Sequence, residues 1–362
     1  MSNLFGHNFR IMTFGESHGP GLGVVVDGLP AGLKVPVRLI QHDLDRRRPG
    51  NSIFTSPRRE PDQVEILSGL TRENRSNGAP LAMLIRNQDA RSKDYDDKKF
   101  RPGHADWTYY QKYGLHPQPG GGRSSGRETV ARVAAGAVAR ILLSPLGIKA
   151  EAYTVAVGGV KAEEIDPDFA EKDPLRFADR SQARQAHQEV EAAMSEGDSV
   201  GSVVEVNLTG VPAGWGEPVF GKLNSRLGAA FLSIGAVRAV EFGDGLALSS
   251  SRGSLANDPL GPEGPQSNRH GGIIGGISTG LPIVARLYIR PTPSIALEQH
   301  SVTVGGQPTT IETHGRHDPC LAPRLAPVAE AMALMCLADF HLEPNRHYIA
   351  INQSVEYETI DH

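Results

Sequence analysis

The stretch Gly15-Glu16-Ser17-His18-Gly19 is echoed by Gly197-Asp198-Ser199-Val200-Gly201, at an offset of 182 residues (15 to 197). The same offset relates further identical residues, in which Val24, Gly28, Pro30, Ala31, Gly32, Pro36 and Val37 recur as Val206, Gly210, Pro212, Ala213, Gly214, Pro218 and Val219. A constant offset over so many positions makes two chance turns of similar composition the weaker interpretation. Since internal repeats determine an architecture, we predict a single domain over 1–362, built from two related halves of approximately 1–180 and 181–362.

Each copy predicts a turn, a strand, a Gly-Pro turn and a helix. Two β-rich runs, 24–26 and 203–208, end at Asp27-Gly28 and Thr209-Gly210. Helices are predicted from Val37 and Val219, and further strands at 237–242 and 283–289. Because helices and strands are mixed throughout, we expect an α/β chain of the α+β sandwich kind, with sheets packed around helices.

Bulk composition narrows the class of protein. The chain has a net charge of -4 and a pI near 6.4, so a general nucleic-acid binder is disfavoured. Two cysteines favour a reducing compartment without a disulfide framework. The first residues lack a signal-peptide pattern, and we expect no apolar stretch to approach the ~20 residues of a membrane span. These features predict a cytoplasmic protein that binds neither nucleic acid nor membrane, and no Cys/His cluster has the spacing of a metal site.

The duplication separates scaffold from chemistry. Glycines and prolines recur because both copies need the same backbone turns. His18 has no counterpart, since position 200 is Val. The turn therefore does not require a histidine, which raises His18 above a lone structural histidine.

Two arginine-containing motifs each allow a structural and a functional interpretation. Arg46-Arg47-Arg48-Pro49-Gly50 fits a solvated helix end or an anion site, since arginine forks match phosphate and carboxylate groups. Nothing local decides between the two. In Arg101-Pro102-Gly103-His104-Ala105-Asp106 a Pro-Gly turn precedes a histidine, which either caps the turn or exchanges protons near neutral pH.

Two glycine-rich segments are equally open to two interpretations. Gly120-Gly121-Gly122-Arg123-Ser124-Ser125-Gly126-Arg127-Glu128 precedes an amphipathic pattern, and Ser125 and Glu128 have capping-box spacing. Its free N–H groups and two arginines favour an anion, although an ordinary capped helix is compatible with this. The segment 266–276 predicts either a backbone pressed against a flat or phosphorylated ligand or a plain loop.

The segment Arg316-His317-Asp318-Pro319-Cys320 precedes another predicted helix. Apolar residues spaced three and four apart run to Leu342, and Asp339 lies among them. A buried carboxylate is costly unless it is paired, so Asp339 is either a functional candidate, an arginine partner or part of a subunit interface. We expect Asp339→Asn not to lower the melting temperature. His317 beside Asp318 is not enough to predict a nucleophilic triad.

Together these motifs resemble the chorismate synthase family. Three signature stretches appear in order, at 15–30, 122–128 and 316–332, and the Arg-Arg-Arg-Pro-Gly, Arg-Pro-Gly-His-Ala-Asp and Gln-Ser-Asn stretches match as well. The resemblance covers essentially the whole chain. So many long motifs in the family's order make it highly specific.

The resemblance implies a carbon–oxygen lyase and a homotetramer. Its reaction is the anti-1,4-elimination of phosphate from 5-enolpyruvylshikimate 3-phosphate to give chorismate. The family uses reduced FMN without net redox change: an electron-rich flavin can assist loss of the allylic phosphate and receive the ring hydrogen. NADP is associated with the family, but no Rossmann fingerprint is visible, so the source of flavin reduction stays open.

The resemblance also implies residue roles. His18 would protonate the departing phosphate, His104 would keep the reduced flavin suitably protonated, and Asp339 would support proton removal through flavin N5. The implied substrate or phosphate site contains Ser17, Arg48, Arg101, Ser125, Arg127 and Arg316. The implied flavin site contains Ser125, Gly126, Gly235, Gly271, Gly272, Arg290, Ser294 and Arg316.

Four positions depart from the family's usual residues: Ile53 and Gly235 stand where arginine and asparagine are usual, Arg290 replaces a lysine, and Leu325 replaces a smaller residue. Two alternatives therefore remain. One is a divergent paralogue acting on another shikimate-like phosphoester, and the other is a flavin-binding homologue that has lost catalysis. Intact His18, His104 and Asp339 argue against the second.

Overall fold

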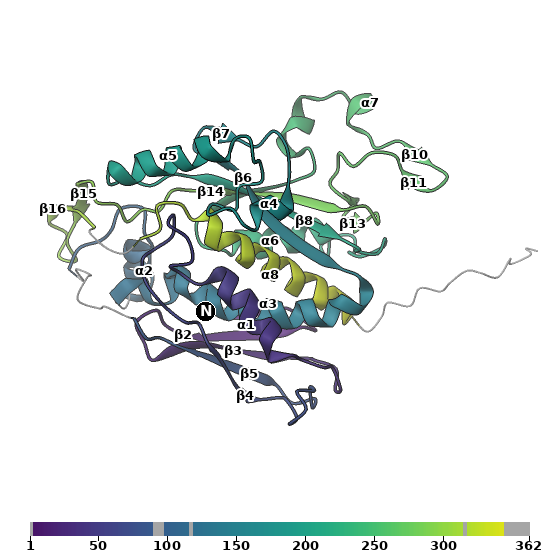
Figure 1. Cartoon of the computed structure of the whole chain (residues 1–362), viewed down its shortest axis with the longest axis horizontal. Helices are drawn as coiled ribbons and strands as arrows, with labels where there is room; N and C mark the ends of the chain where they lie inside the picture. The colour runs from purple at the N-terminus through teal and green to yellow at the C-terminus, as the bar shows by residue number, and fades with distance from the viewer. Residues whose placement is uncertain (1–2, 90–97, 116–118, 314–316, 344–362) are drawn as a thin grey trace, which may run out of the picture.

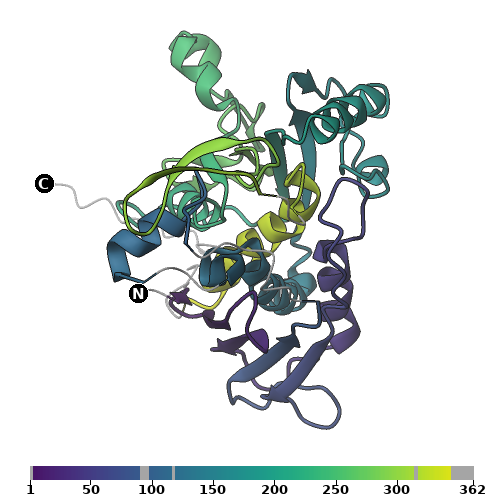
Figure 2. The ribbon, with the colours of Figure 1, turned by 90° about the vertical axis from the view of Figure 1, so that its left-hand side faces the viewer.

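The computed structural model describes residues 3–89, 98–115, 119–313 and 317–343. Two five-stranded antiparallel sheets enclose a layer of helices, and Figure 1 shows α1, α3 and α8 between them. Figure 2, turned by 90°, shows the segment with α7 projecting from the body. The predicted α+β sandwich, with sheets around helices, is confirmed.

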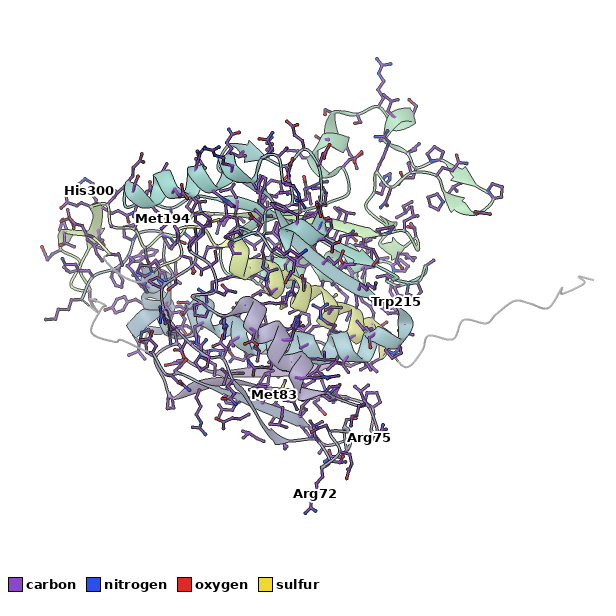
Figure 3. All side chains as sticks on the ribbon, in the orientation of Figure 1. Arg72, Arg75, Met83, Met194, Trp215 and His300 are labelled. Atoms are coloured by element: carbon purple, nitrogen blue, oxygen red, sulfur yellow. The ribbon has the colours of Figure 1, made fainter. Side chains whose placement is uncertain are left out.

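The first sheet has the strand order β1-β2-β3-β5-β4. Its strands are β1 (Leu4–Phe5), β2 (Arg10–Gly15), β3 (Gly21–Asp27), β4 (Val64–Ser68) and β5 (Leu81–Arg86). Alternate side chains of a strand face the same side, and Leu81, Met83 and Ile85 of β5 are fully buried. Figure 3 shows Met83 on the inner side of this sheet and Arg72 pointing to solvent. This sheet therefore contributes one wall of the core.

The second sheet has the strand order β7-β6-β8-β14-β9. Its strands are β6 (Lys149–Val157), β7 (Val160–Lys161), β8 (Ser202–Thr209), β9 (Val237–Phe242) and β14 (Ile283–Ile289). The bounds of β9 and β14 coincide with the predicted strands. In β14, Ile283, Ala285, Leu287 and Ile289 are buried on the face that the alternation predicts.

The middle layer contains α1 (Val37–Arg47), α3 (Thr129–Leu143) and α8 (Ala322–His341). A β-carbon built on Gly136 of α3 would lie 2.3 Å from the β-carbon of Ala331 in α8. Small residues let these two helices approach closely, which keeps the layer thin enough for both sheets to pack on it.

The segment Gly126–Leu146, which includes α3, is long and apolar enough to cross a membrane by length and composition. This differs from the sequence expectation that no stretch approaches that length. However, 72% of its apolar window is buried inside the protein, because α3 packs against the first sheet and against α1 and α8. A helix surrounded by protein must be apolar on nearly every side.

The remaining elements cover the sheets or connect them. The helices are α2 (Asp106–Tyr113), α4 (Pro167–Ala170), α5 (Ala183–Ser195), α6 (Leu223–Leu232) and α7 (Gly253–Ala256), with short 3₁₀ turns η2 (Pro119–Ser124), η3 (Gly126–Glu128), η4 (Ser144–Leu146) and η5 (Gly245–Ser250). The short strands are β10 (Leu260–Gly261), β11 (Gly264–Pro265), β12 (Ile273–Ile274), β13 (Ile277–Ser278), β15 (Gln299–Val302) and β16 (Pro308–Ile311).

The predicted repeats occupy comparable places in the two sheets. β3 and β8 are each the middle strand of a five-stranded sheet, and the next long helix along the chain is α1 or α6 respectively. The second sheet, however, also takes β6 and β7 from before residue 180. We therefore keep the duplication as a proposal, with the two sheets sharing strands across the expected boundary.

Candidate active site

One large cavity collects most of the predicted chemistry. Its volume is about 780 Å³, within the range of small-molecule sites. It is lined by three histidines, His18, His104 and His317. It is also lined by seven arginines, namely Arg58, Arg101, Arg123, Arg127, Arg132, Arg290 and Arg324.

Most of these arginines have a carboxylate partner. The distances are 2.6 Å for Arg58–Glu60, 2.7 Å for Arg101–Asp106, 2.8 Å for Arg132–Glu128 and 2.7 Å for Arg324–Asp318, and Arg127 pairs with Asp62. Among the described residues, Arg123 and Arg290 have no such partner. The cavity wall therefore holds excess positive charge, which attracts anions.

His18 lies in the turn between β2 and β3. Its Nδ1 is 3.1 Å from the hydroxyl of Ser17, and Ser17 is fully buried while His18 lines the cavity. The turn is closed by a bond from the N–H of Gly19 to the carbonyl of Glu16, at 3.2 Å. At the matching position of the other copy, the N–H of Val200 donates to the carbonyl of Pro319. The second copy, which has no histidine, is thus held by a bridge to the segment before α8 rather than by a closed turn.

His104 is coupled to the arginine that precedes it. Its Nδ1 lies 2.7 Å from Asp106, whose other oxygen accepts from Nε of Arg101 at 2.7 Å. Nη1 of Arg101 also donates to Ser294 at 3.3 Å. Burial lowers the pKa of His104 below its usual value, and Arg101 acts in the same direction while Asp106 opposes both. His104 is therefore neutral at neutral pH.

The start of α3 forms another part of the wall, where Ser125, Gly126 and Arg127 line the cavity. Ser125 caps the short turn η3 by accepting from the N–H of Arg127, while Glu128 pairs with Arg132 rather than completing the predicted capping box. Arg127 is 3% exposed, and its buried Nη2 has no hydrogen-bond partner among the described residues. Its charge is compensated by Oε2 of buried Glu60, which lies 3.7 Å away, beyond hydrogen-bond distance.

The basic run at 46–48 ends helix α1, as the structural interpretation predicts, but only Arg48 is solvated. Arg47 is fully buried, with Nη1 3.0 Å from Asp62, and Arg46 binds Glu330 at 2.6 Å. Arg48 is half exposed, 3.7 Å from Asp45, and is not among the described residues that line the cavity. Pro49, the next residue, does line the cavity, so Arg48 lies beside the described lining rather than in it.

Asp339 also lies away from the cavity lining. It is 1% exposed on α8, and Oδ1 accepts from the backbone N–H groups of His7, Asn8 and Phe9 at 2.8, 2.5 and 2.9 Å. Oδ2 pairs with Arg226. Four donors occupy this carboxylate, so the structure favours the arginine-partner alternative over the catalytic one.

Asp318 is a cavity carboxylate to which the sequence interpretation gave no role beyond setting aside a nucleophilic triad with His317. Its Oδ1 accepts from the N–H of Ser56 and its Oδ2 from Arg324, both at 2.7 Å. Its neighbour His317 lines the same cavity, where burial lowers the histidine's pKa to about 4. The signal available in the sequence was the pair itself, beside a predicted helix start.

The predicted flavin residues divide into two groups. Gly235, Arg290 and Ser294 line the cavity together with Ser125 and Gly126. Gly271 and Gly272 are not in its described lining; a β-carbon on either would lie 2.3 Å from Gly243 or 2.5 Å from Pro282. Glycine at these two positions allows the chain to pack closely against itself. Arg316 lies outside the described residues.

The four positions that depart from the family's usual residues also divide into two that line the cavity and two that do not. Gly235 and Arg290 face the cavity, whereas Ile53 is 69% exposed and Leu325 is a core residue. Only the first two can alter a bound ligand directly.

Comparison with known proteins places the chain among carbon–oxygen lyases that act on phosphates. The family model for chorismate synthase matches residues 9–342. The chain belongs to the chorismate synthase family.

Three relatives illustrate the similarity. A chorismate synthase from Syntrophobacter fumaroxidans is 51% identical over 94% of this chain and 97% of its own. One from Methanocella arvoryzae is 52% identical over 93% of each chain. A crystal structure of chorismate synthase is 30% identical, with a TM-score of 0.75 over 92% of both chains. The fold and family predicted from the sequence are confirmed.

Proposed function

We propose that the chain converts 5-enolpyruvylshikimate 3-phosphate to chorismate and phosphate in this cavity, with reduced FMN as cofactor. The observation that carries the proposal is the lining of seven arginines and three histidines. The substrate has one phosphate and two carboxylates, and this negative charge complements the excess positive charge of the cavity wall. Acid–base groups stand beside that charge, as an elimination requires.

The cavity residues fit a flavin nucleotide. The buried Nε of Arg324 lacks a hydrogen-bond partner among the described residues, and a phosphorylated ligand would satisfy such a donor. Gly235, Arg290 and Ser294 would hold the cofactor, with Ser125 and Gly126 between it and the substrate. When bound, reduced FMN supplies an electron-rich ring that assists the loss of the allylic phosphate.

His18 is the proposed proton donor to the departing phosphate. A general acid must reach the oxygen of the leaving group, and His18 lines the cavity on a turn that is closed by the backbone bond from Gly19 to Glu16. The hydroxyl of Ser17 lies 3.1 Å from Nδ1 and fixes the orientation of the ring at the cavity wall. The surrounding arginines stabilise the phosphate as its charge develops.

His104 and Asp318 are the proposed partners in proton handling. An ionised Asp106 can only accept, so Nδ1 of His104 carries the hydrogen and Nε2 of the neutral ring is an acceptor. This suits a residue that governs the protonation of a bound flavin. Asp318 takes the carboxylate role that the resemblance gave to Asp339, because it lines the cavity.

Assembly and location extend the proposal. Leu246, Leu255 and Leu260, on the projecting segment of Figure 2, are 78%, 65% and 77% exposed, which supports burial against other copies in a homotetramer. The two cysteines, Cys320 and Cys336, are free and buried, which supports a reducing, cytoplasmic environment.

The test is an anaerobic assay with the substrate and reduced FMN, in which chorismate and phosphate are both measured. We expect equal amounts of the two products, and none without flavin or with oxidised flavin. Flavin binding without phosphate release would support a homologue that has lost catalysis, and release only from another shikimate-like phosphoester would support a divergent paralogue.

A further inference from the structure

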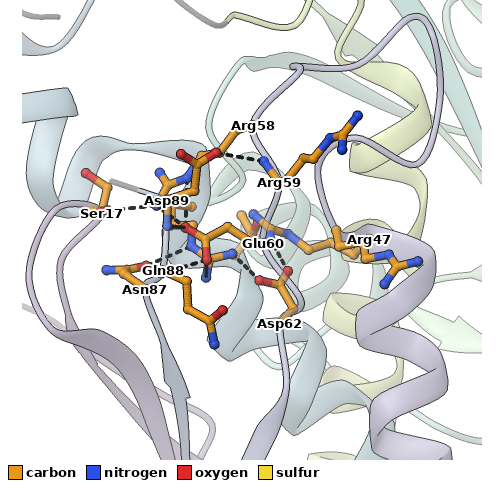
Figure 4. A network of polar contacts seen from close by, with 12 residues as sticks. Ser17, Arg47, Arg58, Arg59, Glu60, Asp62, Asn87, Gln88 and Asp89 are labelled. Atoms are coloured by element: carbon orange, nitrogen blue, oxygen red, sulfur yellow. Dashed lines mark hydrogen bonds and ion pairs between the residues drawn. The ribbon is translucent and has the colours of Figure 1, made fainter. Parts of the chain in front are cut away.

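The chain from 58 to 64 alternates between buried and exposed residues. Glu60, Asp62 and Val64 are buried, whereas Arg59, Pro61 and Gln63 are exposed. The contacts of Arg58, Glu60 and Asp62 place their side chains together on the inner side of this segment, where Arg58 lines the cavity. Figure 4 shows these side chains meeting Arg47 and Asn87 from other segments.

Two buried carboxylates organise this cluster. Oε1 of Glu60 accepts from Nε and Nη2 of Arg58 at 3.0 and 2.6 Å. Asp62, fully buried, pairs with both Arg47 and Arg127. Its φ of 47° is left-handed, a conformation that costs energy for a residue other than glycine and that persists where surrounding contacts impose it.

Asn87 connects the cluster to the turn that carries His18. Its Oδ1 accepts from Nε of Arg127 at 3.0 Å. Its Nδ2 donates to the carbonyls of Glu16 and Gly19 at 2.9 and 2.7 Å. Its backbone N–H donates to the carbonyl of Pro20 at 3.1 Å. One asparagine thus holds three carbonyls of the turn.

Arg58 holds a fourth carbonyl of the same turn. Its Nη2 donates to the carbonyl of Ser17 at 3.3 Å, while Glu60 holds the guanidinium from the other side (Figure 4). The backbone on both sides of His18 is therefore fixed by side chains that Glu60 and Asp62 anchor. The repeat turn near Val200 is held differently, by the backbone of Pro319.

We propose that Asn87 is a positioning residue for His18, and that Glu60 and Asp62 hold Asn87 and Arg58 in place for this task. The inference rests on the proposed function in one respect: the proposed function makes His18 the donor of a proton to the leaving phosphate. Asn87 touches no reacting atom; it keeps the histidine ring where a phosphate in the cavity can reach it.

The test uses Asn87→Asp in the full-length protein. The aspartate keeps an acceptor for Arg127 but replaces two donors by a carboxylate oxygen that faces two carbonyls. We expect the ring resonance of His18 to shift and broaden in spectra of ¹³C-histidine protein, assigned with His18→Gln. We also expect kcat to fall by up to ~10²-fold with KM changed by less than about threefold, because misplacement affects the reacting geometry more than ligand binding.

The matched control is Ser76→Ala. Ser76 is a buried side chain that clamps another turn beside the same sheet, donating to the carbonyl of Pro30 at 2.5 Å and accepting from the N–H of Leu33 at 2.9 Å. Its loss should lower stability but leave the His18 resonance and kcat unchanged. If Asn87→Asp does not fold, Glu60→Gln tests the Arg58 route with the same readouts.

An unchanged His18 resonance and kcat in a folded Asn87→Asp or Glu60→Gln protein would overturn the inference, as would equal effects in Ser76→Ala. The resonance is measured without substrate or flavin. A wild-type protein that makes no chorismate therefore contradicts the proposed function while leaving the positioning test intact.

Discussion

Gly120 lies directly against the imidazole of His18, so that a β-carbon built on Gly120 would come within 2.0 Å of the ring's Cε1. Its backbone is also left-handed, with φ at 73°. The neighbouring Gly121 approaches His104 in the same way, at 3.0 Å. The glycine run of 120–122 therefore lies across two of the cavity histidines, and its lack of side chains makes room for both rings.

Gly120→Ala should displace the His18 ring and lower the rate of phosphate release. The left-handed backbone alone should cost roughly 1–2 kcal/mol of stability for alanine. The added methyl group cannot coexist with the ring in its present place, so kcat should fall well beyond what the stability loss explains. Steady-state kinetics and thermal unfolding are measured on the same preparation.

Gly114→Ala is the matched control for this substitution. Gly114 is also left-handed, with φ at 68°, and a β-carbon there would meet nothing within 4 Å. It should show a similar stability loss with normal kcat. Equal rates in the two variants would show that the contact with His18 does not constrain catalysis.

Arg58→Ala should weaken substrate binding, whereas Arg48→Ala should change it little. Arg58 lines the cavity, and Arg48 is half exposed outside its described lining. Loss of a charge-assisted contact costs on the order of 1.5–3 kcal/mol, while surface substitutions usually stay within about 0.5 kcal/mol. The measurement is the dissociation constant of the substrate for each variant, obtained by titration. An equal loss for Arg48→Ala would mean that Arg48 reaches a bound substrate after all.

Asp339→Asn should destabilise the fold by about 3–5 kcal/mol, because it removes one partner of a buried ion pair. This reverses the sequence expectation of an unchanged or higher melting temperature, since Arg226 and three backbone N–H groups bind the carboxylate. The control is Asp27→Asn, whose pair with Arg10 is about half exposed and should matter little. A melting temperature equal to wild type for Asp339→Asn would argue against the structural role.

Stability should fall as the pH drops from about 6.5 toward about 4, because burial lowers the pKa of His317 to about 4. In the unfolded chain His317 is protonated below pH about 6.5, whereas in the folded chain it stays neutral down to about pH 4. Protonation therefore favours unfolding across this window. Burial lowers the pKa of His104 as well, and it contributes in the same direction. Chemical denaturation at several pH values should show a shallower slope for His317→Gln. An identical slope would mean that His317 does not titrate in this way.

The positions of several strands could be predicted from the sequence because they depend on the local pattern of apolar residues and turns. The strands β9 and β14 have the bounds that alternating apolar residues predict, and β3 and β8 follow from the repeat. The short turn η3 before α3 was not predicted. The sequence predicted a capping box of Ser125 and Glu128, but in the structure Ser125 caps η3 and Glu128 pairs with Arg132 instead.

The sequence predicted which residues lie at the cavity where they belong to a local motif. It did not where the environment of a residue depends on a partner far away in the chain. His18, His104 and Arg127 lie in or beside the cavity as their motifs implied. Asp339 was correctly placed on an apolar helix face, but Arg226, which pairs with it, is 113 residues away. No local pattern reveals such a partner. Asn87 was missed because one isolated asparagine carries no signal until the fold brings the turn against it.

The most direct test of the central claim is the number of chorismate molecules formed per reduced FMN under strict anaerobiosis. Because the proposed elimination has no net redox change, we predict many turnovers per flavin, with phosphate equal to chorismate at every time point. One product per flavin, or phosphate released without chorismate, would contradict the account.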